Sequence, residues 1–315
     1  MGQSQSGPLS GSGSMADILV VGSLAYDTIS TPSGKAPRTL GGSANYFSLA
    51  ASLFAPVKVV GVVGEDYASE DLQMLTSRKV DVSGLKTVKG KTFHWEGAYD
   101  GDMNEAKTLA TELNVFADFN PELPGSYVDA QYVFLANIDP VLQLRVLEQV
   151  RKPRLVGADT MNFWISSKKD VLLKVLSRID ALLINEGEAE MLTGASNAIS
   201  ASDQLIKMGP KAVVVKRGEY GFVLRTQEGF FILPAFPIAK VVDPTGAGDT
   251  FAGAFFGTLA RANQGLDLKT LKEACVNGCL LASFTVESFG VSALTKLTFA
   301  QVQSRAAEFA KVIQQ

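Results

Sequence analysis

The chain has 315 residues, of which 46% are hydrophobic and 19% charged, and its formal net charge is -3 at pH 7. This composition excludes a disordered or fibrous protein and is typical of a globular protein with a large core. The slight acidity argues against a nucleic-acid binder, which would carry a basic patch or stripe. No apolar run reaches the ~20 residues that a membrane helix needs. We therefore expect a soluble protein with neither nucleic acid nor membrane as partner.

The first residues differ in composition from the rest of the chain. Residues 1–14 are mostly Gly, Ser, Gln and Pro, and a second methionine, Met15, stands directly before an apolar run. We expect 1–14 to be a disordered expression leader and 15–315 to form a single α/β domain. Two cysteines, Cys275 and Cys279, lie four residues apart in a helical pattern. In the absence of a secretion signal, they are typical of buried thiols in a reducing cytoplasm.

Short apolar runs alternate with helical patterns along the chain. The runs predict buried strands at Asp17–Val21, Val57–Val63, Tyr132–Leu135, Leu155–Ala158, Ala181–Ile184 and Ala212–Val215. The helical patterns between or after them are Ala44–Phe54, Val141–Val150, Val171–Arg178, Ser200–Met208 and Thr250–Arg261. This alternation predicts an open, mostly parallel α/β sheet with helices on both faces. Such sheets bind ligands outside the carboxyl ends of their strands, so residues directly after the strands are the candidates for chemistry.

Two segments interrupt the alternation. From about 86 to 119 there is no helical period, and Lys91–Tyr99 and Leu109–Phe116 look like strands around a turn at Asp100–Asn104. The segment 29–40 is also irregular and contains two prolines and a glycine. We expect these segments to form a small β-sheet lid over the site; the alternative is surface hairpins without that role. An exposed edge of the lid would invite pairing with a second copy, which predicts a homodimer.

The segment Val242–Ala254, VDPTGAGDTFAGA, is the strongest candidate for catalytic residues. Its Gly-rich turn opens a helix, and the free backbone N–H groups of a helix start favour a bound phosphate. Asp249 lies in the first turn, beside that anion site. There it would take the proton of an attacking hydroxyl in phosphoryl transfer, whose catalysis rests mainly on positioning and charge stabilisation. The alternative is structural, with Asp249 capping the helix and the glycines forming a tight turn.

The chain from Met15 onward resembles the ribokinase-like, or PfkB-type, carbohydrate kinase family, because DPTGAGDTFAGAF is similar to the C-terminal signature of that family. The resemblance implies that Asp249 is the general base and that the backbone of Gly246, Ala247 and Gly248 forms an anion hole. It also implies ATP with Mg²⁺ as phosphate donor. The acceptors of the family are sugars, sugar acids and nucleosides.

Two N-terminal segments carry the expected acceptor site. Residues 22–27, GSLAYD, resemble the family's G-S-x-x-x-D, which implies that Asp27 binds sugar hydroxyls. Residues 40–46, LGGSANY, resemble its N-terminal signature and imply acceptor contacts at Gly41 and Gly42. The family places Asn four residues after the second Gly, where this chain has Tyr46, with Asn45 one residue earlier. A helix turns ~100° per residue, so these two side chains point differently. Either Asn45 or Tyr46 is expected to reach the acceptor.

The resemblance also assigns the donor site. Residues 216–221, KRGEYG, resemble a nucleotide-binding K-x-G-x-x-G turn. They imply that Lys216 faces the phosphates of ATP and that Gly218 and Gly221 allow close approach of the backbone. Thr245, in the signature, is a further expected ATP contact. Asn277, in the next helix, corresponds to a position near the adenine.

Two metal ions are implied as well. Asn185 and Glu188 resemble the N-x-x-E motif, which implies that they hold Mg²⁺, partly through water. The alternative for this pair is a helix start whose acid favours the helix dipole. Asp159 also follows a predicted strand and would join the same network. Asp243 lies in a loop where some relatives bind K⁺, which makes potassium a second candidate ion.

Proteins of other classes compete with the kinase interpretation. A dinucleotide-dependent oxidoreductase needs G-x-G-x-x-G after a strand and an acid about 20 residues further on. Here the third glycine is displaced to Gly253, and there is no acid between Thr250 and Leu266. A non-catalytic regulator or binding protein of the same fold would be expected to lack Asp249 or Glu188, and both are present.

Within the kinase interpretation, the main expectation is a small sugar or sugar-like acceptor. The alternative is a nucleoside kinase, whose acceptor needs an aromatic slot for the base. Four aromatic residues are candidates for that slot: Tyr26, Tyr46, Phe93 and Trp95.

Overall fold

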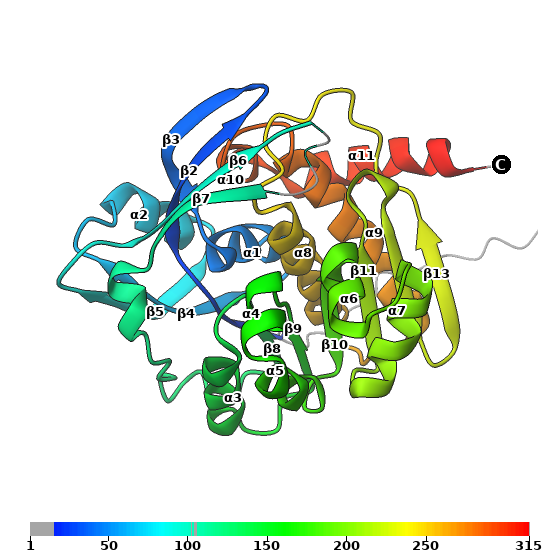
Figure 1. The fold of residues 1–315 in the computed structure, drawn as a ribbon, viewed down its shortest axis with the longest axis horizontal. Coiled ribbons are helices and arrows are strands. Elements are labelled where there is room, and N and C mark those ends of the chain that lie inside the picture. The colour runs from blue at the N-terminus through cyan, green and yellow to red at the C-terminus, as the bar shows by residue number, and fades with distance from the viewer. Residues whose placement is uncertain (1–15, 102, 104–105, 315) are drawn as a thin grey trace, which may run out of the picture.

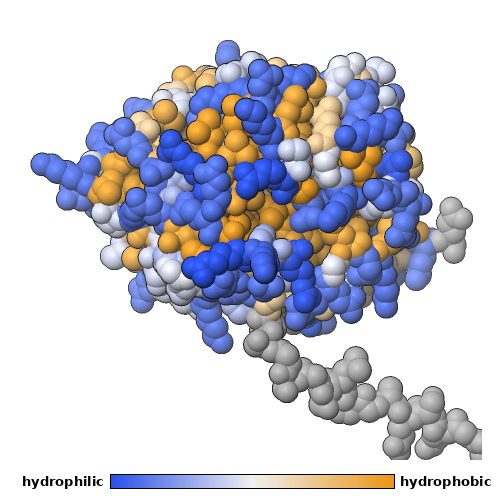
Figure 2. Space-filling view, turned by 90° about the horizontal axis from the view of Figure 1, so that it is seen from below, coloured by the Kyte–Doolittle hydropathy of each residue, from blue (hydrophilic) through white to orange (hydrophobic). Residues whose placement is uncertain are grey.

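A computed structural model of the chain describes residues 16–101, 103 and 106–314. The predicted leader, 1–14, lies outside these residues, as does part of the predicted turn at Asp100–Asn104. Among the helices that are described, none is long and apolar enough to cross a membrane. On the face seen from below in Figure 2, hydrophobic residues appear in patches between hydrophilic ones.

A nine-stranded sheet forms the centre of the molecule, in the order β13-β12-β11-β10-β9-β8-β1-β4-β5. Neighbours pair in parallel except at β12 and β13, which are antiparallel. All six predicted strands are present, each within one residue of its predicted bounds, and the sequence analysis missed β5, β12 and β13. The bounds are β1 Ile18–Val21, β4 Val57–Gly64, β5 Val80–Val88, β8 Tyr132–Leu135, β9 Leu155–Ala158, β10 Ala181–Asn185, β11 Ala212–Lys216, β12 Phe222–Thr226 and β13 Gly229–Leu233.

Helices cover both faces of this sheet, as predicted. Side chains alternate along each strand, so Val20 belongs to one apolar core and Val21 to the other. The first core includes α1 Ser43–Ala51, α2 Ser69–Ser77, α8 Ala247–Ala262, α9 Leu268–Thr285, α10 Ser292–Lys296 and α11 Phe299–Ile313. The second includes α3 Pro140–Gln149, α4 Asn162–Ser167, α5 Lys169–Leu176, α6 Glu186–Thr193 and α7 Ala198–Leu205.

Helix α8 lies against both the sheet and α1. Its aromatic residues Phe251, Phe255 and Phe256 are buried in the first core. Gly253 faces the Phe47 backbone of α1 so closely that a Cβ atom would overlap the Phe47 carbonyl oxygen. The two helices therefore pack backbone to backbone, which sets the start of α8 beside the start of α1. Figure 1 shows both helices near the middle of the molecule, beneath the small sheet.

A separate four-stranded sheet has the order β3-β2-β6-β7 and lies at the upper left of Figure 1. Its strands are β2 Ala25–Thr31, β3 Gly34–Gly41, β6 Phe93–Tyr99 and β7 Ala106–Glu112. The predicted bounds of 29–40 and 86–119 need two corrections. β2 begins at Ala25, so Asp27 is part of this sheet. Residues 86–88 end β5, because they pair in parallel with β4, and 114–118 form a short 3₁₀-helix.

Candidate active site

Three polar residues follow neighbouring strands at the carboxyl edge of the large sheet. They are Asp159 after β9, Asn185 at the end of β10 and Lys216 at the end of β11. Two residues before each of them stand Gly157, Leu183 and Val214, which face the core shared with α8. Since strand side chains repeat every two residues, all three polar side chains emerge on the α8 side of the sheet.

The start of α8 is a Gly-rich turn. Gly246 precedes the helix with φ of 74°, in the left-handed region. A Cβ atom at this position would overlap the ring of Tyr46, so the turn requires glycine for both its conformation and its contact. The Ala247 N–H donates to the Pro244 carbonyl at 3.2 Å. Of the three residues predicted to form an anion hole, Ala247 therefore already uses its N–H within the turn.

Lys216 lies directly beside this turn. Its Nζ atom would be 2.9 Å from a Cβ atom at Gly248 and donates to Asp159 Oδ2 at 3.0 Å. Burial alone would lower the pKa of Lys216, but the carboxylates of Asp159, Glu188 and Asp249 outweigh it and raise that pKa. The ammonium group is thus charged and placed next to the start of α8, where an anion would meet it.

Asp249 occupies the first turn of α8. Together with Lys216, Asp159 and Glu188 it forms one charged cluster. Burial, with the nearby Asp159 carboxylate, raises its pKa to about 7, and Lys216 opposes that rise. A carboxyl group with a pKa near neutrality takes up a proton more readily than an ordinary aspartate, which suits a general base. The structure therefore brings the predicted base, the Gly-rich turn and a cation together.

Asn185 and Glu188 form the start of α6. The Asn185 side chain accepts from the Glu188 N–H at 2.8 Å, and Glu188 Oε2 accepts from the Asn185 N–H at 3.0 Å. This reciprocal capping box confirms that a helix starts here, and the metal role of the pair stays a prediction. It leaves Glu188 Oε1 outside the cap. Burial and the Asp159 charge raise the pKa of Glu188 to about 7, and the Lys216 charge opposes that rise. The Glu188 carboxyl group is therefore close to both Asp159 and Lys216.

Asp27 lies above Gly41 and Gly42. Its carboxylate fills the space that a Cβ atom at Gly41 would occupy, and a Cβ at Gly42 would be 2.6 Å from the Ser23 carbonyl oxygen. Burial, with the charges of Asp243 and Asp249, raises the pKa of Asp27 to about 8. The charge of Asp249 acts on Asp27, so the predicted acceptor anchor and the predicted base lie near each other.

Asn45, one of the two alternatives for an acceptor contact, makes hydrogen bonds within the protein, and its contact with the acceptor stays a prediction. It is fully buried, its Nδ2 donates to the Gly41 carbonyl at 2.6 Å, and its Oδ1 accepts from the Tyr67 hydroxyl at 3.1 Å. Both ends of the amide are therefore used within the protein. The Tyr46 hydroxyl, in contrast, is buried without a hydrogen-bond partner, and Asp27 and Asp249 are among the charges acting on it.

Asp243 and Thr245, ahead of α8, both make hydrogen bonds within the protein. Asp243 is fully buried, and its two oxygens accept from the N–H groups of Thr245 at 2.9 Å and Gly290 at 3.0 Å. Its role with potassium stays a prediction. The Thr245 hydroxyl donates to the Tyr99 hydroxyl of the small sheet at 3.2 Å, so it is turned toward the small sheet. No motif pointed to Tyr99, which is 146 residues away in the chain.

Gly218, Gly221 and Asn277 belong to the predicted ATP site. Gly218 and Gly221 both have positive φ, 53° and 86°, and Gly221 packs against the end of β13. Asn277 donates to Thr258 of α8 at 3.0 Å. It lines a hollow of about 450 Å³ formed by Phe54 and by residues of α8, α9 and α11. The roles of these three residues with ATP stay predictions.

The four candidate aromatic residues do not form one slot either. Tyr26 bonds Asp71 at 2.7 Å and Phe93 stacks on Phe116. Trp95 is the register partner of Asp27 in the small sheet, so its indole lies on the same face as the acceptor anchor.

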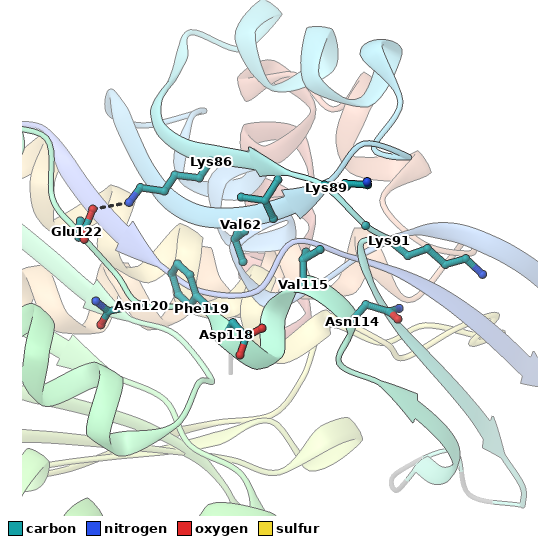
Figure 3. A pocket seen from close by; sticks show the side chains of 12 residues that line it. Val62, Lys86, Lys89, Lys91, Asn114, Val115, Asp118, Phe119, Asn120 and Glu122 are labelled. Atoms are coloured by element: carbon teal, nitrogen blue, oxygen red, sulfur yellow. Dashed lines mark hydrogen bonds and ion pairs between the residues drawn. The ribbon is translucent and has the colours of Figure 1, made fainter.

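A second hollow, of about 600 Å³, lies beside β5 and the 3₁₀-helix at 114–118. Figure 3 shows Val62, Val115 and Phe119 along it, with Lys86 paired to Glu122 at one side. None of the predicted site residues lines it.

A large parallel sheet, a small second sheet and a Gly-rich helix start with a buried carboxylate define a ribokinase-like small-molecule kinase. The profile of the pfkB family of carbohydrate kinases matches residues 15–297. The chain is 35% identical to the cytidine kinase of Thermococcus kodakarensis over 78% of this chain and 90% of that protein. The chain belongs to the pfkB family and is an ATP-dependent kinase.

Solved structures agree on the fold. The nucleoside kinase of Methanocaldococcus jannaschii superposes with a TM-score of 0.75 at 24% identity, covering 94% of this chain and 99% of that one. Aminoimidazole riboside kinase from Salmonella enterica, solved with its riboside and an ATP analogue, gives a TM-score of 0.73 at 23% identity, with coverage of 92% and 99%.

Proposed function

We propose that this kinase transfers the γ-phosphate of ATP to a hydroxyl of a nucleoside, with Asp249 as general base. The observation that carries the catalytic part is the position of Asp249, buried in the first turn of α8 beside Lys216 and the Gly246–Gly248 turn. The similarity to a cytidine kinase supports a nucleoside rather than a free sugar. Trp95 supports it too, because its indole lies on the same face of the small sheet as Asp27, over Gly97, and an aromatic side chain on that face suits a stacked base.

Each residue of the cluster has a distinct task in this proposal. Asp27 accepts hydrogen bonds from acceptor hydroxyls and orients the sugar. Asp249 orients the attacking hydroxyl and takes its proton. The N–H groups at the start of α8 and the Lys216 ammonium stabilise the charge on the transferred phosphoryl group. The small sheet over the site keeps out water, which would otherwise accept the phosphoryl group.

Magnesium fits the residues present. No group of three or more metal-ligating side chains occurs among residues 16–101, 103 and 106–314. That suits Mg²⁺, which keeps several waters and is bound by one or two carboxylates together with substrate phosphates. Glu188 would supply the carboxylate, with Asn185 holding it in place. The ion, when bound, would neutralise charge on the phosphates of ATP.

The proposal is tested by measuring ADP release with ATP, Mg²⁺ and one of cytidine, uridine, adenosine, inosine, ribose or fructose. We expect a nucleoside to stimulate ADP release and free ribose to do so weakly. Stimulation by ribose or fructose alone would overturn the nucleoside assignment while leaving the kinase intact. A wild-type protein that binds ATP but releases no additional ADP with any of these compounds would contradict both the nucleoside and the sugar as acceptor.

The pH dependence of the reaction is expected to follow Asp249, which must be ionised to act as a base. With its pKa at about 7, kcat/KM for the acceptor should rise with pH through that value. Asp159→Asn removes a neighbouring negative charge, which favours the ionised form of Asp249 and so lowers its pKa. We expect the acidic limb of the profile to move to lower pH.

The matched control for that experiment is Asp180→Asn. Asp180 precedes β10 and pairs with Lys211 at 2.7 Å at the opposite end of the same strands. It should leave the acidic limb where it is. If the acidic limb of the pH profile stays in place in the Asp159→Asn variant, or moves to higher pH, then Asp249 is not the titrating group.

We also propose a cytoplasmic homodimer. The edges of the small sheet are β3 and β7, and β7 is exposed along almost all of its length. An exposed edge strand offers unpaired N–H and C=O groups to a second copy. We expect light scattering to give twice the mass of the chain. A monomer across the working concentration range would remove this proposal without affecting the kinase assignment.

A further inference from the structure

Three side chains of the small sheet region are joined to the segment that leads into α8. Thr31, at the end of β2, donates from Oγ1 to the Val242 carbonyl at 2.8 Å. Ser33, in the following turn, donates to the Val241 carbonyl at 3.3 Å. Tyr99, at the end of β6, accepts from the Thr245 hydroxyl at 3.2 Å. The small sheet and its turn therefore contact the short segment 241–245 at three points.

That segment lies within residues 234–246, which belong to no helix or strand. Within it, the buried Asp243 carboxylate accepts from the N–H groups of Thr245 and Gly290. On one side, the Val242 N–H donates to the Val286 carbonyl at 2.7 Å, at the end of α9. On the other side stand the contacts from Thr31 and Tyr99. The next residue after Thr245 is Gly246, where α8 begins, so the place of the first turn depends on how both sides hold the segment.

The residues that hold the segment lie on the same face of the small sheet as the acceptor anchor. Asp27 pairs with Trp95 in register between β2 and β6. Thr31 and Tyr99 follow them by four residues each, an even number, so their side chains emerge on the same side as Asp27. One face of the small sheet therefore carries both the acceptor anchor and the contacts to the anion-binding turn.

We propose that Thr31 and Tyr99 are positioning residues which hold the Gly246–Gly248 turn in place to receive the γ-phosphate. This inference rests on the proposed function, because it takes that turn as the γ-phosphate site. It assigns the small sheet a second task beyond covering the acceptor.

The test compares ATP with ADP, because only the γ-phosphate reaches the turn. Thr31→Val and Tyr99→Phe each remove one hydroxyl and keep the shape of the side chain. Titration calorimetry on the full chain measures the Kd of both nucleotides in the presence of Mg²⁺. We expect each variant to weaken ATP by about fivefold, the size of one ordinary hydrogen bond. The Kd of ADP should stay within about twofold on the same scale.

Matched controls make the same chemical changes elsewhere. Thr28→Val alters β2 on its other face, where Thr28 bonds His94 at 3.0 Å. Tyr127→Phe removes a hydroxyl that donates to the Asp81 carbonyl at 3.0 Å, away from the small sheet. Both should leave the ratio of the two Kd values unchanged.

The outcomes are distinct. A selective loss of ATP affinity in the Thr31 and Tyr99 variants supports the proposal. Equal weakening of ATP and ADP, or no change in either, overturns it, because the contacts would then serve general stability or nothing measurable. If Tyr99→Phe fails to fold, Thr31→Val decides the question alone. A wild-type protein that binds neither nucleotide would overturn the proposed function first, and this inference with it.

Discussion

Replacing Asp249 with alanine is expected to lower kcat by about 100-fold or more, the usual span for loss of a general base. The carboxylate is the proton acceptor in the proposed reaction, and its pKa of about 7 makes it suited to that task near neutral pH. Lys216 and the start of α8 remain in this variant, so binding of ATP should persist. The measurement is ADP release under saturating ATP and acceptor, with the Kd of ATP determined alongside.

The isosteric variant Asp249→Asn separates proton transfer from positioning. It keeps the size of the side chain and one acceptor oxygen, replaces the other oxygen with an NH₂ donor, and cannot take a proton at neutral pH. We expect it to be as slow as Asp249→Ala. A near-normal kcat in either variant would show that another group takes the proton, and a lost ATP affinity in both would point to a structural role at the start of α8.

Replacing Gly246 with alanine is expected to lower kcat by about 100-fold or more as well, because removal of one well-placed donor from such a site has an effect of that size. The φ angle of 74° costs an alanine about 1–2 kcal/mol. The added Cβ would also overlap the Tyr46 ring, which is only 1% exposed and cannot move aside. The first turn of α8 must then shift, and its N–H groups no longer point at the phosphate.

Gly194→Ala is the matched control. Gly194 ends α6 with φ of 76°, and a Cβ there would have no neighbour within 4 Å. Its substitution imposes the same backbone cost without a clash and without touching the cluster. Urea unfolding should show a loss of stability in both variants, and activity should fall only in Gly246→Ala. A Gly246→Ala protein as stable and as active as Gly194→Ala would exclude this turn from catalysis.

Much of the site was predictable because its signals are local. The Gly-rich turn with Asp249 lies within one short segment, and Lys216, Asn185 and Asp159 each follow an apolar run that ends at the same sheet edge. Parallel strands bring their carboxyl ends together, so a linear pattern was enough to predict a shared site. The hydrogen bonds of Asn45 were not predictable, because the direction of its buried amide depends on Gly41 and on Tyr67, and Tyr67 is distant in sequence.

The sequence by itself predicted six strands of the large sheet and the Gly-rich turn that opens α8 with Asp249, because apolar period, glycine and a helix start act over a few residues. Only the tertiary structure decided which side chains meet across the molecule. Thr31 contacts Val242 over 211 residues, and Tyr99 contacts Thr245 over 146. Such contacts follow from how whole sheets and helices pack, and no local pattern records that packing.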